Sequence, residues 1–191
     1  MTIFLILAPY GAYTFLMLVT SATSSVFAAS AICIATVAVD LALGRSLKIL
    51  AAGSAIVFAA IGLYLVLRDP KLSTLGVKLW VDVGIFALSL GSMLVRRPFT
   101  LQYAIESVPA ETAAMPGFLR ANYIITSAWT AAALLMMAAN IVLLYVPGLP
   151  LWSGLAVAFA ARNSAIYFTK RYPEYCRIKY AAPAAALPHP H

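Results

Sequence analysis

Four ionisable side chains lie within apolar stretches of this 191-residue sequence: Asp40, Lys78, Asp82 and Arg162. Lys78 and Asp82 are four residues apart, so they share one face if their stretch is helical. At about 1.5 Å of rise per residue, Arg162 falls between Asp82 and Asp40 in depth, and either aspartate could be its partner. Ionisable groups inside a membrane mark ligand sites or polar pathways by default. The alternative is an internal ion pair that fixes helix packing.

The composition assigns the chain to a structural class. Apolar residues make up 63% of it and charged residues 10%, whereas soluble globular domains carry about 45–50% and about 25%. These fractions exclude an ordinary soluble protein, a disordered chain and a small disulfide-rich scaffold. They predict an all-α fold, a polytopic bundle of transmembrane helices, because hydrocarbon requires every backbone N–H and C=O to be paired within the chain.

About six segments are apolar over the roughly 20 residues that a helix needs to cross a bilayer. They cover approximately residues 3–19, 25–43, 49–67, 75–95, 121–146 and 151–169. We expect a single transmembrane domain over residues 1–172 and a tail over 173–191 that is disordered at its end. The first segment could instead be a signal peptide, but residues 1–3 lack the basic side chain that such a peptide carries. This favours a retained helix.

The basic residues predict the orientation of the chain, whose net charge is +7. With six spans, nine lysines and arginines fall on one side of the membrane and three on the other. Loops with the excess of basic residues face the cytoplasm, so both termini are expected there. No basic patch interleaved with aromatic residues points to nucleic acid as a partner. The larger group is Arg45, Lys48, Arg96, Arg97, Arg120, Lys170, Arg171, Arg177 and Lys179, and the smaller group is Arg68, Lys71 and Lys78.

The segment 96–106 predicts a short helix lying on the cytoplasmic face of the membrane. Pro98 suits the first turn of such a helix, and Arg96 and Arg97 would lie at the depth of the lipid headgroups. The alternative is a docking surface for a partner protein. Apolar residues recur behind Pro98 at helical spacing, namely Phe99, Leu101, Tyr103 and Ile105.

Asn122 and Asn140 bracket the fifth apolar segment, with Trp129 between them. We expect both asparagines to hydrogen-bond to neighbouring helices, which contributes about 0.6–2 kcal/mol per bond. No motif for a catalytic, metal or cofactor site occurs. Cys33 lies in an apolar segment and Cys176 in a basic one, so we expect no disulfide.

Several of these residues, in this order and spacing, resemble a known family. They are Lys78, Arg97-Pro98, Gln102, Pro116, Asn122, Trp129 and Asn140. The chain is similar to the bacterial intracellular septation protein A family over about residues 7–169. The resemblance implies a multi-pass protein of the bacterial inner membrane that maintains septation and the cell envelope through contacts with the division and envelope-synthesis machinery. It implies no enzymatic reaction.

Three hypotheses of function follow. The first is a non-enzymatic interaction protein whose partners are lipids and membrane proteins, with residues 96–120 as the partner-facing surface. The second is a small transporter or channel with a polar path through Lys78, Asp82, Asp40 and Arg162. The third is a lipid-modifying enzyme, which is disfavoured because the titratable groups are scattered in depth. A homo-oligomer is a further possible partner arrangement, but its signal in the sequence is weak, because no glycine pair has the four-residue spacing of the helix-dimer motif.

Overall fold

The computed structural model describes residues 2–181, with side chains for residues 8–150 and 152–179. Over these residues the chain forms helices and connecting turns, without a β-strand. The prediction of an all-α fold is therefore confirmed. The helices are α1 (Thr2–Val19), α2 (Ala22–Ala42), α3 (Ile49–Leu67), α4 (Thr74–Leu94), α5 (Phe99–Ile105), α6 (Ala110–Ala113), α7 (Pro116–Tyr145) and α8 (Leu151–Ala181).

Local sequence signals set the helix boundaries. Ser21 and Ser73 precede α2 and α4, and each hydroxyl accepts a 3.1 Å hydrogen bond from the backbone N–H three residues later. This is the N-cap arrangement. Gly44 and Gly148 follow α2 and α7 with φ angles of +70° and +88°, which glycine adopts without steric cost. Pro116 lies in the first turn of α7, where its missing N–H removes no helical hydrogen bond.

The C-terminal end differs from the prediction. α8 continues through Pro173 to Ala181, so the first part of the predicted tail is helical. Side chains along this extension contact one another: the rings of Phe168 and Tyr172 stack with centroids 5.0 Å apart. Residues 182–191, which hold the rest of the predicted tail, lie outside the described residues.

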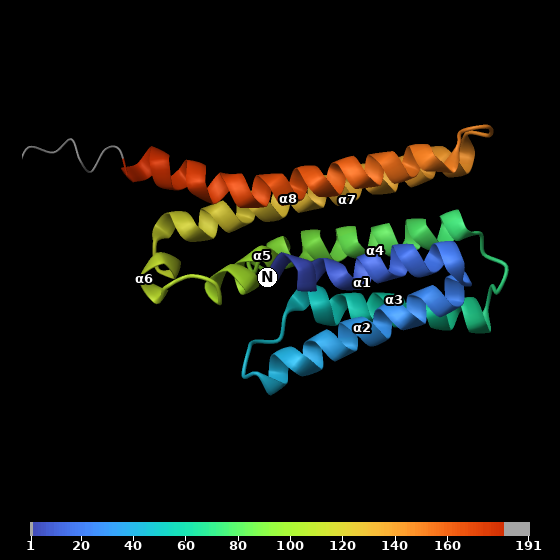
Figure 1. Cartoon of the computed structure of the whole chain (residues 1–191), viewed down its shortest axis with the longest axis horizontal. Coiled ribbons are helices and arrows are strands. Elements are labelled where there is room, and N and C mark those ends of the chain that lie inside the picture. Colours follow the sequence, from blue (N-terminus) through green and yellow to red (C-terminus); the bar gives the residue numbers. More distant parts are fainter. Residues whose placement is uncertain (1, 182–191) are drawn as a thin grey trace, which may run out of the picture.

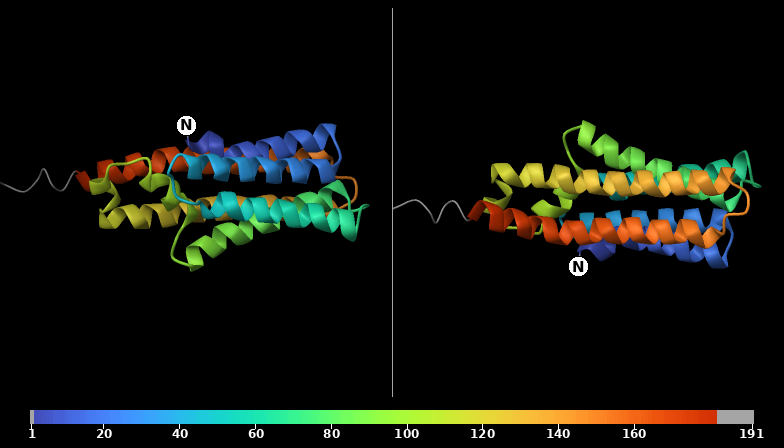
Figure 2. Two further views of the ribbon diagram at one scale, coloured as in Figure 1. Left: turned by 90° about the horizontal axis from the view of Figure 1, so that it is seen from below. Right: turned by 90° about the horizontal axis from the view of Figure 1, so that it is seen from above.

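The helices lie side by side in a bundle with two distinct ends. The α1–α2, α3–α4 and α7–α8 connections gather at one end (Figure 1). The α2–α3 connection, α5 and α6 lie toward the other, which we call the α5 end. Figure 2 shows the same division from two further sides. α1 packs mainly on α2, and α8 packs on α7.

Four of the described helices are long and apolar enough to cross a membrane: α2, α3, α4 and α7. Within the residues whose side chains the structure describes, α1 contributes a shorter apolar stretch, Ala8–Val19. Length and composition therefore support four spans directly, against the predicted count of about six. The outer surface carries large exposed apolar side chains on every long helix, and apolar surface of this extent favours a membrane-embedded protein. Examples from the six long helices in order are Phe15, Ile34, Leu63, Trp80, Leu135 and Phe159.

Among the side chains that the structure describes, two apolar clusters hold the bundle together. The larger joins α1–α4 around Phe58, whose ring centroid lies 5.9 Å from that of Tyr10 and 5.4 Å from that of Tyr13. The smaller joins α7 and α8 through Ala132, Ala161 and other small side chains. Small residues let helix backbones approach closely where lipid supplies no hydrophobic drive between helices.

α3 and α4 approach closely at glycines, which yields a first prediction. A Cβ on Gly84 would overlap the branched side chain of Val57, which has little rotamer freedom with which to move away. We expect Gly84→Ala to lower the free energy of unfolding by about 1–2 kcal/mol. Gly91→Ala, in the same helix but facing open space, should be neutral or stabilising. Thermal melts of both variants in detergent make the comparison, and equal melting temperatures would contradict the close approach.

Candidate functional site

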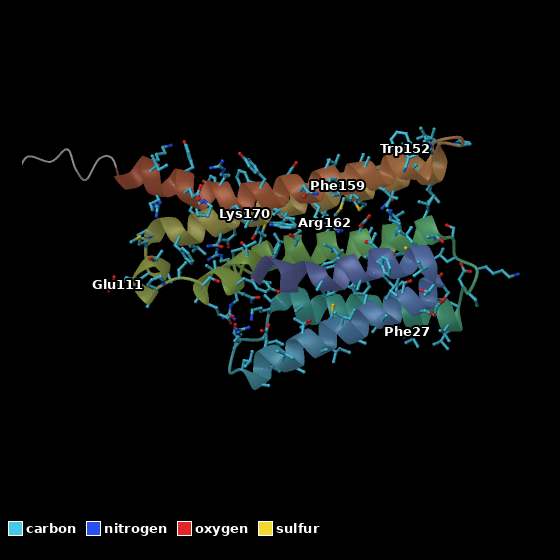
Figure 3. All side chains as sticks on the ribbon, viewed as in Figure 1. Phe27, Glu111, Trp152, Phe159, Arg162 and Lys170 are labelled. Atoms are coloured by element: carbon cyan, nitrogen blue, oxygen red, sulfur yellow. The ribbon has the colours of Figure 1, made fainter. Side chains whose placement is uncertain are left out.

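Four helices contribute polar groups to one interior site. α4 buries Asp82 and places Lys78 one turn away on the same face, as the sequence predicts. Asn140 of α7 is 4% exposed and donates a side-chain N–H to Oδ2 of Asp82. Arg162 lies on the side of α8 that faces α4 (Figure 3). α1 contributes Tyr13, whose buried hydroxyl has no hydrogen-bond partner among the described residues.

These side chains line a partly open cavity of about 430 Å³, which we call the interior cavity. The rest of its wall is largely apolar and includes Ile85, Met136 and Phe159. Ligand sites commonly measure about 300–1,000 Å³ and combine apolar walls with a few placed polar groups. The interior cavity has both properties.

Arg162 is not paired in the way that the sequence suggests. Among the described residues, neither Asp40 nor Asp82 makes a direct ion pair with it. Asp40 pairs instead with Lys48 and Arg45, at 3.0 Å and 3.2 Å, because the short α2–α3 connection brings these cations beside it. Asp82 shares the interior cavity with Arg162 but takes its hydrogen bond from Asn140 on α7.

The Lys48 cluster, which consists of Asp40, Arg45, Lys48 and Glu106, lies at the α5 end. The Lys48 side chain is only 2% exposed, and its Nζ lies 3.1 Å from Oε2 of Glu106 in addition to its contact with Asp40. The ammonium group also lies 5.4 Å from the centre of the Tyr103 ring. One lysine thus ties the end of α2 to the end of α5.

Gln102 strengthens the same junction. Its side-chain oxygen accepts a 2.8 Å hydrogen bond from the backbone N–H of Ile49, the first residue of α3. The first N–H groups of a helix have no acceptor within the helix. Gln102 of α5 supplies an acceptor for one of these groups in α3. The residue that the resemblance singled out in α5 therefore has a structural contact. No sequence pattern indicates the contacts that Lys48 and Glu106 make.

Of the three hydrogen-bonding α7 side chains that the sequence points to, two bond to neighbouring helices and one bonds within α7. Nε1–H of Trp129 donates to the hydroxyl of Thr169 at 2.9 Å, which links α7 to α8. Asn140 bonds across to α4, as predicted. The Asn122 side chain instead donates to the carbonyl oxygen of Phe118 in its own helix, so the prediction of an interhelical bond is wrong there.

Hydroxyl pairs that the sequence analysis did not single out also connect α7 to its neighbours. The hydroxyl oxygens of Ser89 in α4 and Thr130 in α7 lie 2.7 Å apart. Those of Thr100 in α5 and Thr126 in α7 are also 2.7 Å apart. Such bonds each contribute modestly between membrane helices. Serine and threonine hydroxyls can also donate to a backbone carbonyl one turn earlier in their own helix. Their positions in the sequence therefore do not indicate which neighbouring helix they will contact.

The chain reverses between α4 and α5 at residues 95–98. Arg96 adopts a left-handed backbone with φ of +58°, and Pro98 is fully buried. The backbone N–H of Phe99 donates to the hydroxyl of Ser92 at 3.1 Å. α5 thus buries its first turn in the bundle, whereas Arg96 and Arg97 are exposed. The position of these arginines at lipid headgroups stays a prediction.

Two further cavities adjoin the interior cavity. The Trp129 cavity, of about 240 Å³, includes Asn122 and Trp129 in its wall, and the Lys48 cavity, of about 310 Å³, lies beside the Lys48 cluster. Tyr10 lines all three cavities. Arg162 lines both the interior cavity and the Trp129 cavity.

Glu106 makes the Lys48 cluster sensitive to pH. Burial alone would raise the pKa of this carboxyl, but hydrogen bonds from Lys48 and Ser46 hold its pKa below the usual value of 4.5. A carboxyl with a lowered pKa in the folded state contributes stability above its unfolded pKa and loses it as the pH falls through the folded pKa. We therefore expect the melting temperature to fall on acidification below about pH 4.5, and Glu106→Gln to reduce that fall.

Melting curves from neutral to acidic pH test this expectation. Glu111→Gln is the matched control, because Glu111 is an exposed glutamate in α6 outside the cluster. It should keep the acid dependence of the parent protein. Identical acid dependence in the parent protein and the Glu106→Gln variant would show that the cluster does not respond to pH through Glu106.

The fold and the site together define an all-helical protein with an apolar exterior suited to a membrane and with polar groups in its interior. Among the described residues, no group of three His, Cys, Asp or Glu side chains could hold a metal ion, and Cys33 and Cys176 are free thiols. No protein-family model, curated protein or solved structure matches the chain. The similarity to the septation protein A family therefore stays a prediction from its motif residues.

Proposed function

We propose that this chain is a six-span membrane protein that carries a small solute with a polar or charged group through its helical bundle. The observation that carries the proposal is the series of adjoining cavities that share Tyr10. Their walls include Lys78, near the start of α4, and Glu106, after α5. Polar groups within apolar helices commonly line solute and ion pathways. A series of cavities with largely apolar walls and a few charged groups, running from one end of the bundle toward the other, suits such a pathway.

The six-span arrangement adds α1 and α8 to the four helices that qualify by composition. It is supported by their alignment with the bundle and by the alternation of the connections between its ends (Figure 1). With this arrangement, nine basic residues fall toward the α5 end and three toward the opposite end. This asymmetry supports an orientation with the α5 end in the cytoplasm of a bacterial cell. Reporter fusions at residue 191 and in the turn 147–150 should then read cytoplasmic and external, respectively. Both reporters on the same side would contradict six spans.

The charges favour a solute path over a purely structural role. A packing role predicts that interior cations are matched by direct carboxylate partners, because burying an unpaired charge is costly. Among the described residues, Lys78 and Arg162 have no such partner. Both line the interior cavity.

Electrometry on proteoliposomes tests transport directly. Rapid application of a panel of small organic anions, cations and neutral solutes should give a transient current or a flux for at least one class. Lys78→Met and Arg162→Met should abolish it. Lys71→Met and Lys170→Met, which change exposed lysines, should preserve it. Absence of solute movement with correctly inserted protein would overturn the proposal.

The interaction function implied by the resemblance is a second candidate. The observation that favours it is an exposed patch that joins Leu94 and Val95 to Arg96 and Arg97. Apolar and basic side chains together suit a membrane-protein partner at the cytoplasmic face. Changing both arginines to glutamine should then remove cross-links to division or envelope proteins in cells, whereas the interior variants should retain them. Unchanged cross-links in the arginine variant would exclude this surface.

A further inference from the structure

We infer that the interior cavity binds the anionic group of a small amphiphilic molecule, a carboxylate or a phosphate, between Lys78 and Arg162. The inference rests on the proposed function in that it names the substrate class of the same path. It concerns binding, however, and can be measured without transport.

The balance of charge in the cavity favours an anion. Two cations, Lys78 and Arg162, line it together with one carboxylate, Asp82. That carboxylate is hydrogen-bonded to Asn140, and no direct ion pair joins it to either cation within the described residues. The charged side chains thus leave one positive charge in excess. A bound anion would meet two cations and one carboxylate, whereas a bound cation would meet two like charges and one carboxylate.

The two cations suit the oxygens of one acidic group. A guanidinium group offers several N–H donors in a planar fork that matches carboxylate and phosphate. An ammonium group on a flexible stem adds a point charge from another direction. Lys78 comes from α4 and Arg162 from α8, so an anion between them would be held by two separate helices.

Tyr13 adds an independent indication of a ligand. It is 5% exposed, lines the cavity from α1, and has a buried hydroxyl with no hydrogen-bond partner among the described residues. Buried polar groups in proteins are nearly always hydrogen-bonded. A ligand oxygen in the cavity would accept this hydrogen bond.

The apolar walls of the interior cavity indicate the chemistry of the rest of the ligand. Val81, Ile85, Met136, Leu155 and Phe159 form much of the surface around the charged groups. A cavity of about 430 Å³ has room for far more than a single water or ion. An acidic head with an apolar body fits this combination. The molecule could be a free organic acid or the acidic head of a lipid, and the two share this chemistry.

Isothermal titration calorimetry on the full chain in phosphatidylcholine nanodiscs tests the inference. The probe is benzoate, with benzyl alcohol as the neutral analogue and benzylammonium as the cationic one. We expect saturable binding of benzoate, binding of the alcohol weaker by about tenfold, and no saturable binding of benzylammonium. Absence of saturable benzoate binding, or equal binding of all three probes, would overturn the inference.

Variants then locate the binding site. Lys78→Met and Arg162→Met should each weaken benzoate binding by about tenfold or more, and Arg162→Lys should retain part of it. Lys71→Met and Lys170→Met are controls at exposed lysines and should bind as the parent does. Asp82→Asn should tighten binding, because it removes a like charge while its side-chain oxygen can still accept from Asn140. A purely structural defect would not improve affinity, so weaker binding in Asp82→Asn would count against the site.

Lipid composition distinguishes the two sources of the anion. If phosphatidylglycerol in the nanodisc competes with benzoate, the occupant is a lipid head; if benzoate binds equally in both membranes, it is a free acid. Either result supports an anion site. Benzoate binding without any flux would refute the transport proposal alone. Flux of cations or neutral solutes without benzoate binding would refute the anion site alone.

Discussion

Lys48→Met should lower the free energy of unfolding by about 3–5 kcal/mol, the largest effect that we expect from a single substitution in this chain. Lys48 Nζ lies 3.0 Å from Asp40 and 3.1 Å from Glu106. Methionine keeps the length and the apolar stem of the side chain but removes its charge. Two partly buried carboxylates would then face each other without the cation that separates them, so the contact between α5 and the α2–α3 connection should weaken.

The effect can be measured by thermal or detergent-induced unfolding of the purified protein. Arg45→Met is the matched control, because Arg45 contacts the same Asp40 carboxylate at 3.2 Å but is 46% exposed. Exposed ion pairs contribute about 1 kcal/mol or less, so this variant should remain close to the parent. Equal losses in the two variants would contradict the central position of Lys48. Adding Asp40→Asn and Glu106→Gln to Lys48→Met should restore part of the stability.

Asn140→Leu should lower the free energy of unfolding by about 2–3 kcal/mol. The side chain of Asn140 donates to the buried carboxylate of Asp82 across the α4–α7 interface. Leucine would leave that carboxylate without its hydrogen bond. A second change, Asp82→Asn, removes the charge that lacks a partner and should recover part of the loss.

Asn163→Leu is the matched control on α8. Asn163 is exposed, and among the described residues its side chain donates to the carbonyl oxygen of Phe159 in its own helix, at 2.8 Å. Detergent-unfolding curves of the three variants should show a large loss for Asn140→Leu alone, a smaller loss for the double variant and almost none for Asn163→Leu. If the double variant is less stable than Asn140→Leu, the two side chains do not act as a pair.

The class of fold follows from composition, but the pairing of polar groups does not. Apolar runs are a property of each segment by itself, so the helices could be predicted from the sequence. The shared face of Lys78 and Asp82 is likewise local, because four residues make about one helical turn. Asn140, in contrast, meets Asp82 from 58 positions along the chain, and this contact depends on which helices become neighbours.

The contacts of Arg162 and Lys48 likewise depend on tertiary packing that the sequence does not reveal. Depth alone allowed Arg162 to reach either Asp40 or Asp82, whereas Asp40 is engaged by cations from the adjoining turn. In the sequence, Lys48 is only one of the charges that orient the chain, because a lysine near a helix end is commonly solvated. Its burial arises from α5, which folds back over the α2–α3 connection and brings Glu106 and Tyr103 beside it.

The separation of Asp82 and Asn140 along the chain has a consequence for biogenesis. In the six-span arrangement, α4 leaves the ribosome well before α7, and a charged residue at the centre of an inserting helix costs about 2.5–3.5 kcal/mol. During this interval Asp82 lacks the amide that it later contacts, but Lys78 lies one turn away in the same helix. The helix therefore brings its own counter-charge into the translocon. Completion of α7 then supplies Asn140 to the aspartate, and the lysine is left to face the cavity.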